Sequence, residues 1–141
     1  MILWAARLRP YERGQAVEFP YLVDNMNEFP AGWFYIECPN RQNQVLTVSE
    51  ISMQPSIRVE LRPKKIGGQH RHHQLWCYHQ GFIVNRHSGC VLGVEKAKTV
   101  DQCVFQSKRL QQGERKQTWR FENSKLLLCN GEMRYALVSA R

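Results

Sequence analysis

Hydrophobic positions along the chain fall in short runs rather than in long stripes. Most runs hold β-branched and aromatic side chains, alone or alternating with polar ones, and Asn, Gly, Ser or Pro separates them. This pattern is typical of short β-strands, and no apolar stripe of helical period with a cap and a stop predicts a long helix. Twelve strands are expected, at residues 2–6, 16–19, 33–38, 45–48, 57–62, 75–78, 82–85, 91–95, 103–107, 118–121, 125–129 and 135–139.

So many short strands in 141 residues predict one all-β domain, closed or nearly closed, since closure leaves no unpaired sheet edge. The chain is 43% hydrophobic and 11% aromatic, which is enough for one core and excludes wholesale disorder. We therefore expect a single domain over residues 1–141.

A three-residue pattern of Gln, any residue and a large apolar residue recurs along the chain. The clear copies are Gln74-Leu75-Trp76 and Gln117-Thr118-Trp119, and the weaker copy is Gln15-Ala16-Val17. Each copy is followed by one strand and then by a strand with an apolar triplet, and another strand precedes it. Four strands in each of three units account for the twelve strands.

The spacing of the copies predicts how the units are arranged. Gln15 lies 59 residues before Gln74, Gln74 lies 43 residues before Gln117, and 39 residues lead from Gln117 through both termini back to Gln15. We therefore expect the third unit to be split, with two strands at each end of the chain. The two termini should lie close together with the first and last strands paired, and residues 20–31 should form an inserted connection.

The repeated residues predict a structural role. A glutamine amide can bond backbone groups, and a buried indole contributes a large area while its N–H needs one acceptor. We therefore expect Gln74, Trp76, Gln117 and Trp119 to close and fill the core rather than to contact a ligand.

These repeats resemble the β-trefoil of the ricin B-type lectin family, and fungal members in particular. The likeness rests on the two Gln-x-Trp copies, on Gly81-Phe82-Ile83-Val84-Asn85, on Ser88-Gly89-Cys90-Val91-Leu92 and on Gly32-Trp33-Phe34-Tyr35-Ile36. The resemblance covers nearly the whole chain. It implies a β-trefoil of three four-strand units and non-enzymatic binding of glycans.

In that family, a sugar is held by an Asp in the apolar triplet, an aromatic residue after the third strand and an Asn before the Gln. The corresponding positions here are Thr47, Arg62 and His73 in the first unit, Gly93, Gln106 and Lys116 in the second, and Val138, Trp4 and Gly14 in the third. The Asp is replaced in every unit, and only Trp4 keeps the stacking ring. This departure puts the family's usual galactose binding in doubt.

Two candidate sugar sites follow from these positions. In the first, Trp4 is a stacking ring near Gln15. In the second, a polar set would bind an acidic or sulfated sugar through Arg62; its members are Thr47, Arg62, His73 and Gln74. The alternative is that Trp4 packs in the interior and that Arg62 is a solvated charge at a strand end.

The chain is basic, with 20 Lys and Arg against 12 Asp and Glu and a formal charge of +8. Such a balance favours anionic partners, here a glycan or a lipid head group, since no nucleic-acid-binding motif accompanies it. If loops after the third strands gather on one face, they form an anion-binding patch; its members are Arg62, Lys64, Lys65, Lys108, Arg109 and Arg115. The alternative is a scattered solubilising surface.

Other functions find little support in the residues. All five histidines lie between His70 and His87 without the spacing of a defined metal site, so neither a metal nor a cofactor is expected. No catalytic set, phosphate-binding glycine loop or long apolar span stands out. The five cysteines show no Cys-x-x-Cys spacing, and the start does not read as a usual secretory signal, so a reducing, cytoplasmic setting is favoured.

The sequence thus predicts a β-trefoil that binds glycans without catalysis. The alternative is a degenerate trefoil that binds a protein or an anionic surface and no sugar.

Overall fold

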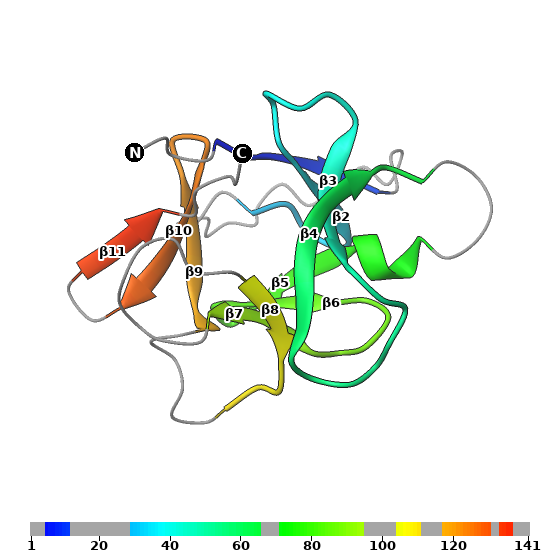
Figure 1. Ribbon diagram of the computed structural model, residues 1–141. Coiled ribbons are helices and arrows are strands. Elements are labelled where there is room, and N and C mark those ends of the chain that lie inside the picture. The colour runs from blue at the N-terminus through cyan, green and yellow to red at the C-terminus, as the bar shows by residue number, and fades with distance from the viewer. Residues whose placement is uncertain are drawn as a thin grey trace.

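The computed structural model describes residues 5–11, 29–65, 71–94, 104–110 and 117–130, and the strand at 133–136; of residues 129–130 and 133–136 only the backbone is considered. In these residues the chain forms β-strands and one 3-10 turn, η1, at His72–Gln74 (Figure 1), so the predicted all-β class is confirmed. The strands are β1 Arg7–Pro10, β2 Phe34–Glu37, β3 Gln44–Val48, β4 Ile57–Pro63, β5 Trp76–His79, β6 Phe82–Asn85, β7 Val91–Val94, β8 Val104–Ser107, β9 Trp119–Glu122, β10 Lys125–Asn130 and β11 Met133–Ala136.

Eight strands make one sheet in the order β1-β2-β3-β4-β8-β7-β6-β5. An additional pairing of β2 with β5, through Phe34 and Trp76, joins the far end of this sheet back to its beginning. The sheet is therefore a ring, and its members from β2 to β5 have neighbours on both sides. The remaining strands form a three-stranded sheet in the order β11-β10-β9.

The beginning of the described chain lies against the second sheet. Ala5 forms an antiparallel bridge with Lys125, and the backbone N–H of Ala6 donates to the carbonyl of Ser124 at 2.9 Å. This contact joins residues close to the N-terminus with a hairpin close to the C-terminus. The expected contact of the termini themselves lies outside the described residues.

Two hairpins turn in the tightest way available to antiparallel strands. Gln80 and Gly81 connect β5 to β6, and Asn123 and Ser124 connect β9 to β10. All four residues have positive φ, between 50° and 93°. Positive φ at both central residues is the requirement of a type I′ turn, whose twist matches that of the flanking strands.

The pair β1 and β2 has no tight two-residue turn of this kind. Its pairing continues through Pro10 opposite Phe34, and the N–H of Tyr11 donates to the carbonyl of Trp33 at 2.9 Å. The connection therefore begins beyond Tyr11 and includes the predicted insertion at 20–31, of which residues 20–28 lie outside the described ranges.

The first described strand follows the predicted strand at 2–6, of which residues 2–4 lie outside the described residues. β1 covers Arg7–Pro10, where no strand was predicted. Its side chains alternate: Ala6 is buried and Leu8 packs on the core, while Arg7 and Arg9 point to solvent. The predicted strand at 16–19 and the end of the one at 135–139 lie outside the described residues.

The larger of two hydrophobic clusters in the described residues lies inside the ring and reaches the second sheet. Trp76 and Trp119 are its largest buried side chains, at 0% and 1% exposure, and Phe29, just before β2, packs against it. Because this cluster includes residues from both sheets, they form one packed unit.

The smaller cluster consists of Tyr35, Val45 and Leu75. The partly buried rings of Tyr11 and Trp33 pack against it.

Candidate functional site

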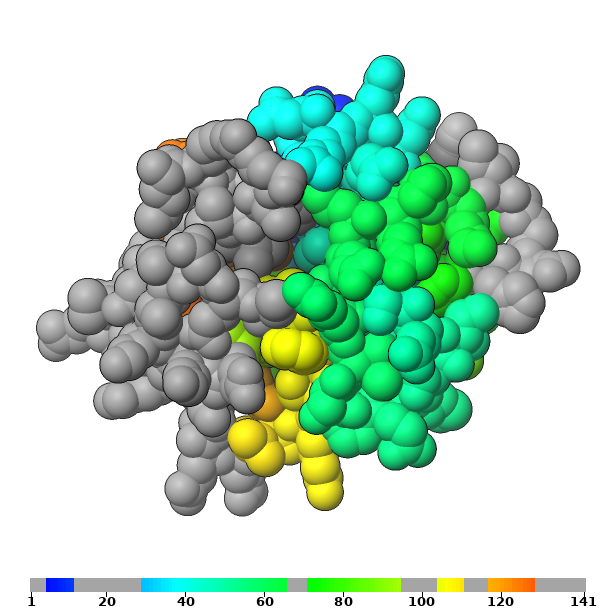
Figure 2. Space-filling view, in the orientation of Figure 1, coloured from blue at the N-terminus to red at the C-terminus, as the bar shows by residue number. Residues whose placement is uncertain are grey.

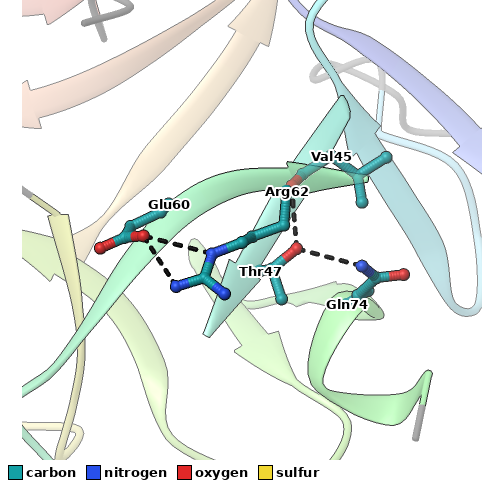
Figure 3. A network of polar contacts seen from close by, with 5 residues as sticks. All are labelled: Val45, Thr47, Glu60, Arg62 and Gln74. Carbon is teal, nitrogen blue, oxygen red and sulfur yellow. Dashed lines mark hydrogen bonds and ion pairs between the residues drawn. The ribbon is translucent and has the colours of Figure 1, made fainter. Parts of the chain in front are cut away.

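Gln74, at the end of η1, connects three parts of the chain through its side-chain amide. Its Nε2 donates to the carbonyl of Pro63 at 2.9 Å and to Oγ1 of Thr47 at 3.2 Å, and its Oε1 accepts from the N–H of Lys65 at 2.9 Å. The Thr47 hydroxyl in turn donates to the carbonyl of Val45 at 2.9 Å (Figure 3). The amide therefore has partners at both of its ends, and it holds the end of β4 against β3.

Gln117 repeats these contacts 43 residues later. Its Nε2 donates to the carbonyl of Lys108 at 2.8 Å, and its Oε1 accepts from the N–H of Leu110 at 3.0 Å. The tryptophans repeat theirs too: the indole N–H of Trp76 donates to the Leu46 carbonyl at 3.1 Å, and that of Trp119 to the Leu92 carbonyl at 3.0 Å. Both Gln-x-Trp segments thus close neighbouring strand pairs in the same way.

A third position follows from the backbone register. Trp76 pairs with Phe34, the N–H of Trp119 donates to the Gly81 carbonyl, and the N–H of Ala6 donates to the Ser124 carbonyl. Ala6 therefore occupies the position that a tryptophan occupies in the other two. The predicted third copy, Gln15-Ala16-Val17, lies outside the described residues. Ala6 itself keeps no side-chain trace of the motif.

Most of the predicted polar sugar set is enclosed by the fold. Thr47, His73 and Gln74 are buried, with exposures of 3%, 5% and 0%. Because these side chains are inside and the Thr47 and Gln74 groups bond to each other, their assignment as ligand contacts is corrected to a structural role. Arg62 alone is exposed, and its Nη2 lies 3.0 Å from Oε1 of Glu60 (Figure 3). Trp4 and Gln15 lie outside the described residues.

The predicted basic patch is divided between two places. β4 and β8 are antiparallel, and Gln106 near the end of β8 pairs with Ile57 at the start of β4. The segments that carry the basic residues after β4 and after β8 therefore leave from opposite ends of β4, as Figures 1 and 2 show. The structure does not bring Arg62, Lys64 and Lys65 together with Lys108 and Arg109, and Arg115 lies outside the described residues.

Two of these basic residues have equivalent aromatic partners. The Lys64 Nζ lies 4.3 Å from the centroid of the Tyr35 ring, and the Arg109 Cζ lies 4.1 Å from that of Phe82. Lys64 is also 3.5 Å from Oε2 of Glu37, and Arg109 donates to Gln80 at 3.3 Å. Lys64 thus contacts residues of β2, and Arg109 contacts residues of the β5–β6 hairpin.

A cluster of arginines and aromatic rings lies beside the end of the β1–β2 pairing, where Tyr11 bonds to Trp33. This cluster was not predicted from the sequence. We call it the Arg–aromatic cluster; its members are Tyr11, Trp33, Tyr35, Arg71 and Arg86. The Arg86 Cζ lies 5.2 Å from the Trp33 ring centroid and 5.7 Å from that of Tyr11, and the Arg71 Cζ lies 5.5 Å from the Tyr11 ring. Tyr11 and Tyr35 meet edge to face at 6.1 Å.

The arginines of this cluster have few acceptors. Nη1 of Arg71 donates to the Tyr11 hydroxyl at 3.1 Å, but Nε of Arg71 and Nη1 of Arg86 are buried with no hydrogen-bond partner. The positive charges of Arg71 and Arg86 influence the pKa values of neighbouring side chains. Burial raises the pKa of Tyr35 while Arg71 opposes the rise, and burial together with Arg86, His87 and Arg71 lowers the pKa of His72. Positive charge from Arg71 thus opposes the rise at Tyr35 and, with Arg86, adds to the fall at His72.

Among the residues that the structure describes, no three His, Cys, Asp or Glu side chains lie together in a way that could hold a metal ion. In the same part of the chain, no helix is long and apolar enough to cross a membrane.

Comparisons with known proteins extend only to structure. No family model matches the chain, and no curated protein matches it. Among solved structures, the solution structure of the mdaA-1 domain is 21% identical, with a TM-score of 0.59 over 81% of this chain and 84% of that domain. A designed threefold-symmetric protein, ThreeFoil, is 24% identical, with a TM-score of 0.47 over 69% of this chain and 83% of that one. At 21% identity, the likeness to the mdaA-1 domain is one of fold.

Proposed function

We propose that this chain is a β-trefoil of three four-strand units that binds glycans without catalysis, in the manner suggested by its resemblance to ricin B-type lectins. The third unit is divided between the two ends of the chain. The repeated Gln and Trp contacts and the bridge from Ala5 to Lys125 support this arrangement.

The observation that carries glycan binding is the pair of rings presented by the extended hairpin. Tyr11 and Trp33 are partly exposed and are held side by side by the backbone bond between them. An aromatic face stacks on the apolar side of a pyranose, and nearby polar groups bond its hydroxyls. The Arg–aromatic cluster holds rings beside polar groups, whereas Thr47 and His73, at two positions used by the resembled family, are buried here.

A glycan array tests this proposal. The wild-type chain is expected to bind a subset of glycans, and Trp33→Ala is expected to weaken that binding by up to about tenfold, since one aromatic contact contributes ~0.5–1.5 kcal/mol. Ile51→Ala removes an exposed apolar side chain elsewhere and is the matched control. Thermal unfolding of Trp33→Ala shows whether the variant is folded. A folded wild-type chain with no bound glycan contradicts the proposal.

A second function is favoured by one observation: the side chains of Lys108 and Arg109, which directly follow β8, are exposed. They suit an anionic surface, as in a degenerate trefoil that binds a protein or lipid head groups and no sugar. Binding to vesicles with 30% anionic lipid, lost in roughly 0.5 M salt, together with a silent glycan array, would favour this function.

A further inference from the structure

The Arg–aromatic cluster holds two cations with unused donor capacity. A guanidinium has five N–H groups. Among the described residues, Arg71 has one side-chain hydrogen bond, to Tyr11, and the guanidinium of Arg86 has none. Buried donors without acceptors are costly and rare in folded proteins. Nε of Arg71 and Nη1 of Arg86 are therefore buried donors whose cost no hydrogen bond within the described part of the protein offsets.

Ion pairs do not relieve this cost in the described part of the chain. The carboxylates that pair there do so with other cations: Glu37 with Arg7, Arg9 and Lys64, Glu60 with Arg62, and Glu122 with Arg120. Arg71 and Arg86 lie over the same Tyr11 ring and both act on His72. Two like charges that share one ring are stabilised by an anion near both of them.

The rings limit where these two cations can point. Arg86 lies over both Trp33 and Tyr11, and Arg71 is tethered by the Tyr11 hydroxyl. These contacts keep the two guanidinium groups beside the rings, and the planar fork of a guanidinium suits bidentate bonding to a carboxylate or sulfate. The partly exposed rings beside them suit a flat apolar surface rather than a bare ion.

We propose that Arg71 and Arg86 together bind the oxyanion substituent of an acidic sugar, a carboxylate or a sulfate, whose pyranose ring lies against Trp33 and Tyr11. This inference rests on the proposed glycan binding and adds the chemical class of the ligand. It also replaces Arg62, which the sequence suggested for the same chemistry and which pairs with Glu60.

Calorimetric titration tests the inference with four probes: methyl glucuronide, a sulfated methyl galactoside, uncharged methyl galactoside and sodium sulfate. The acidic sugars are expected to bind at least about tenfold more tightly than the uncharged sugar, because hydrogen bonds to charged groups are the stronger ones. Arg86→Gln and Arg71→Gln should each remove that preference. Arg62→Gln, at an exposed arginine of another site, should leave it unchanged. The two acidic probes decide between carboxylate and sulfate.

The variants remain informative about folding. Arg86→Gln removes a charge without a hydrogen bond, so its unliganded thermal midpoint should equal or exceed that of the wild-type chain. Arg86→Lys keeps the charge but not the planar fork, and it should lose most of the preference.

The outcomes separate this inference from the proposed function. If uncharged and acidic sugars bind equally and Trp33→Ala abolishes both, glycan binding stands and the acidic ligand is wrong. If Arg62→Gln, and not the cluster variants, removes the preference, the acidic ligand stands and its assignment to Arg71 and Arg86 is wrong. If sodium sulfate binds with the same Arg dependence but no sugar does, glycan binding fails and the sugar part of the inference fails with it. If none of the four probes binds, both are overturned.

Discussion

The ring of Phe29 stacks on the ring of Tyr78, with centroids 3.9 Å apart and planes 8° from parallel. Phe29 precedes β2 and Tyr78 lies in β5, so the contact joins the end of the long β1–β2 connection to the core of the ring. Phe34 and Phe121 lie 6.0 Å from Phe29, on two further strands. Phe29 therefore packs among three other aromatic rings, those of Phe34, Tyr78 and Phe121.

Phe29→Ala should therefore destabilise the domain. Truncating a buried phenylalanine costs about 3–5 kcal/mol, and Phe29 is only partly buried, so a loss of about 3 kcal/mol is expected. Phe29→Leu keeps most of the volume and should lose less. Urea unfolding with an unchanged m-value measures the difference. Equal stability of the alanine variant and the wild-type chain would show that the stacking is dispensable.

Gln74→Leu should be as damaging as a core truncation although it adds an apolar group. It leaves the Lys65 N–H and the Pro63 carbonyl without their partner, and each buried unsatisfied group costs about 1–3 kcal/mol. Gln117→Leu should behave alike because its two backbone contacts are equivalent, although Gln74 also bonds to Thr47. Gln54→Leu, at an exposed side chain, is the control in chemical denaturation. A difference of several kcal/mol between Gln74→Leu and Gln117→Leu would contradict the structural equivalence.

Two glycines give a matched pair of backbone tests. Gly81 and Gly89 both have positive φ, +93° and +77°. A Cβ at Gly81 would lie 3.3 Å from Cγ2 of Thr118, whereas one at Gly89 would meet nothing within 4 Å. Gly89→Ala should cost about 1–2 kcal/mol from the backbone alone, and Gly81→Ala should cost more. Thermal unfolding of both variants checks the order; a more stable Gly81→Ala would refute the turn geometry.

His72 predicts how stability depends on pH. Its pKa is lowered below 6.5 in the folded chain, first by burial and then by Arg86, His87 and Arg71. The unfolded chain therefore binds the proton more readily, so this group lowers stability as the pH falls through 6.5 and has no effect well above it. His72→Gln should flatten that fall in pH-dependent denaturation. His79→Gln, at the exposed end of β5, is the control.

The same histidine links pH to the ligand. An oxyanion bound by Arg71 and Arg86 would favour protonated His72, so acidic sugars should bind more tightly at pH 5.5 than at pH 7.5. Calorimetry at both pH values measures this change. Affinity that is independent of pH in the wild-type chain, or equally dependent in His72→Gln, would exclude His72 from the linkage.

Strand positions could be predicted because side-chain alternation is local. The apolar residues of β5, β6 and β7 alternate or run together within four residues, and burial follows that pattern. The repeated Gln74 and Gln117 could likewise be found, since the Gln-x-Trp pattern recurs and makes equivalent backbone contacts. The third equivalent could not, because Ala6 is recognised only by the hydrogen bond that it makes to Ser124.

The sequence by itself determined an all-β chain with two matching Gln-x-Trp segments, because hydrophobic periodicity and turn residues act over a few positions. Only the tertiary structure decided which polar residues a ligand can reach. It buried Thr47 and Gln74 against each other, and it brought Tyr11 to Arg71, 60 residues away, where the β1–β2 hairpin continues beyond the usual turn. Such contacts depend on strand register and loop length, which no local pattern encodes.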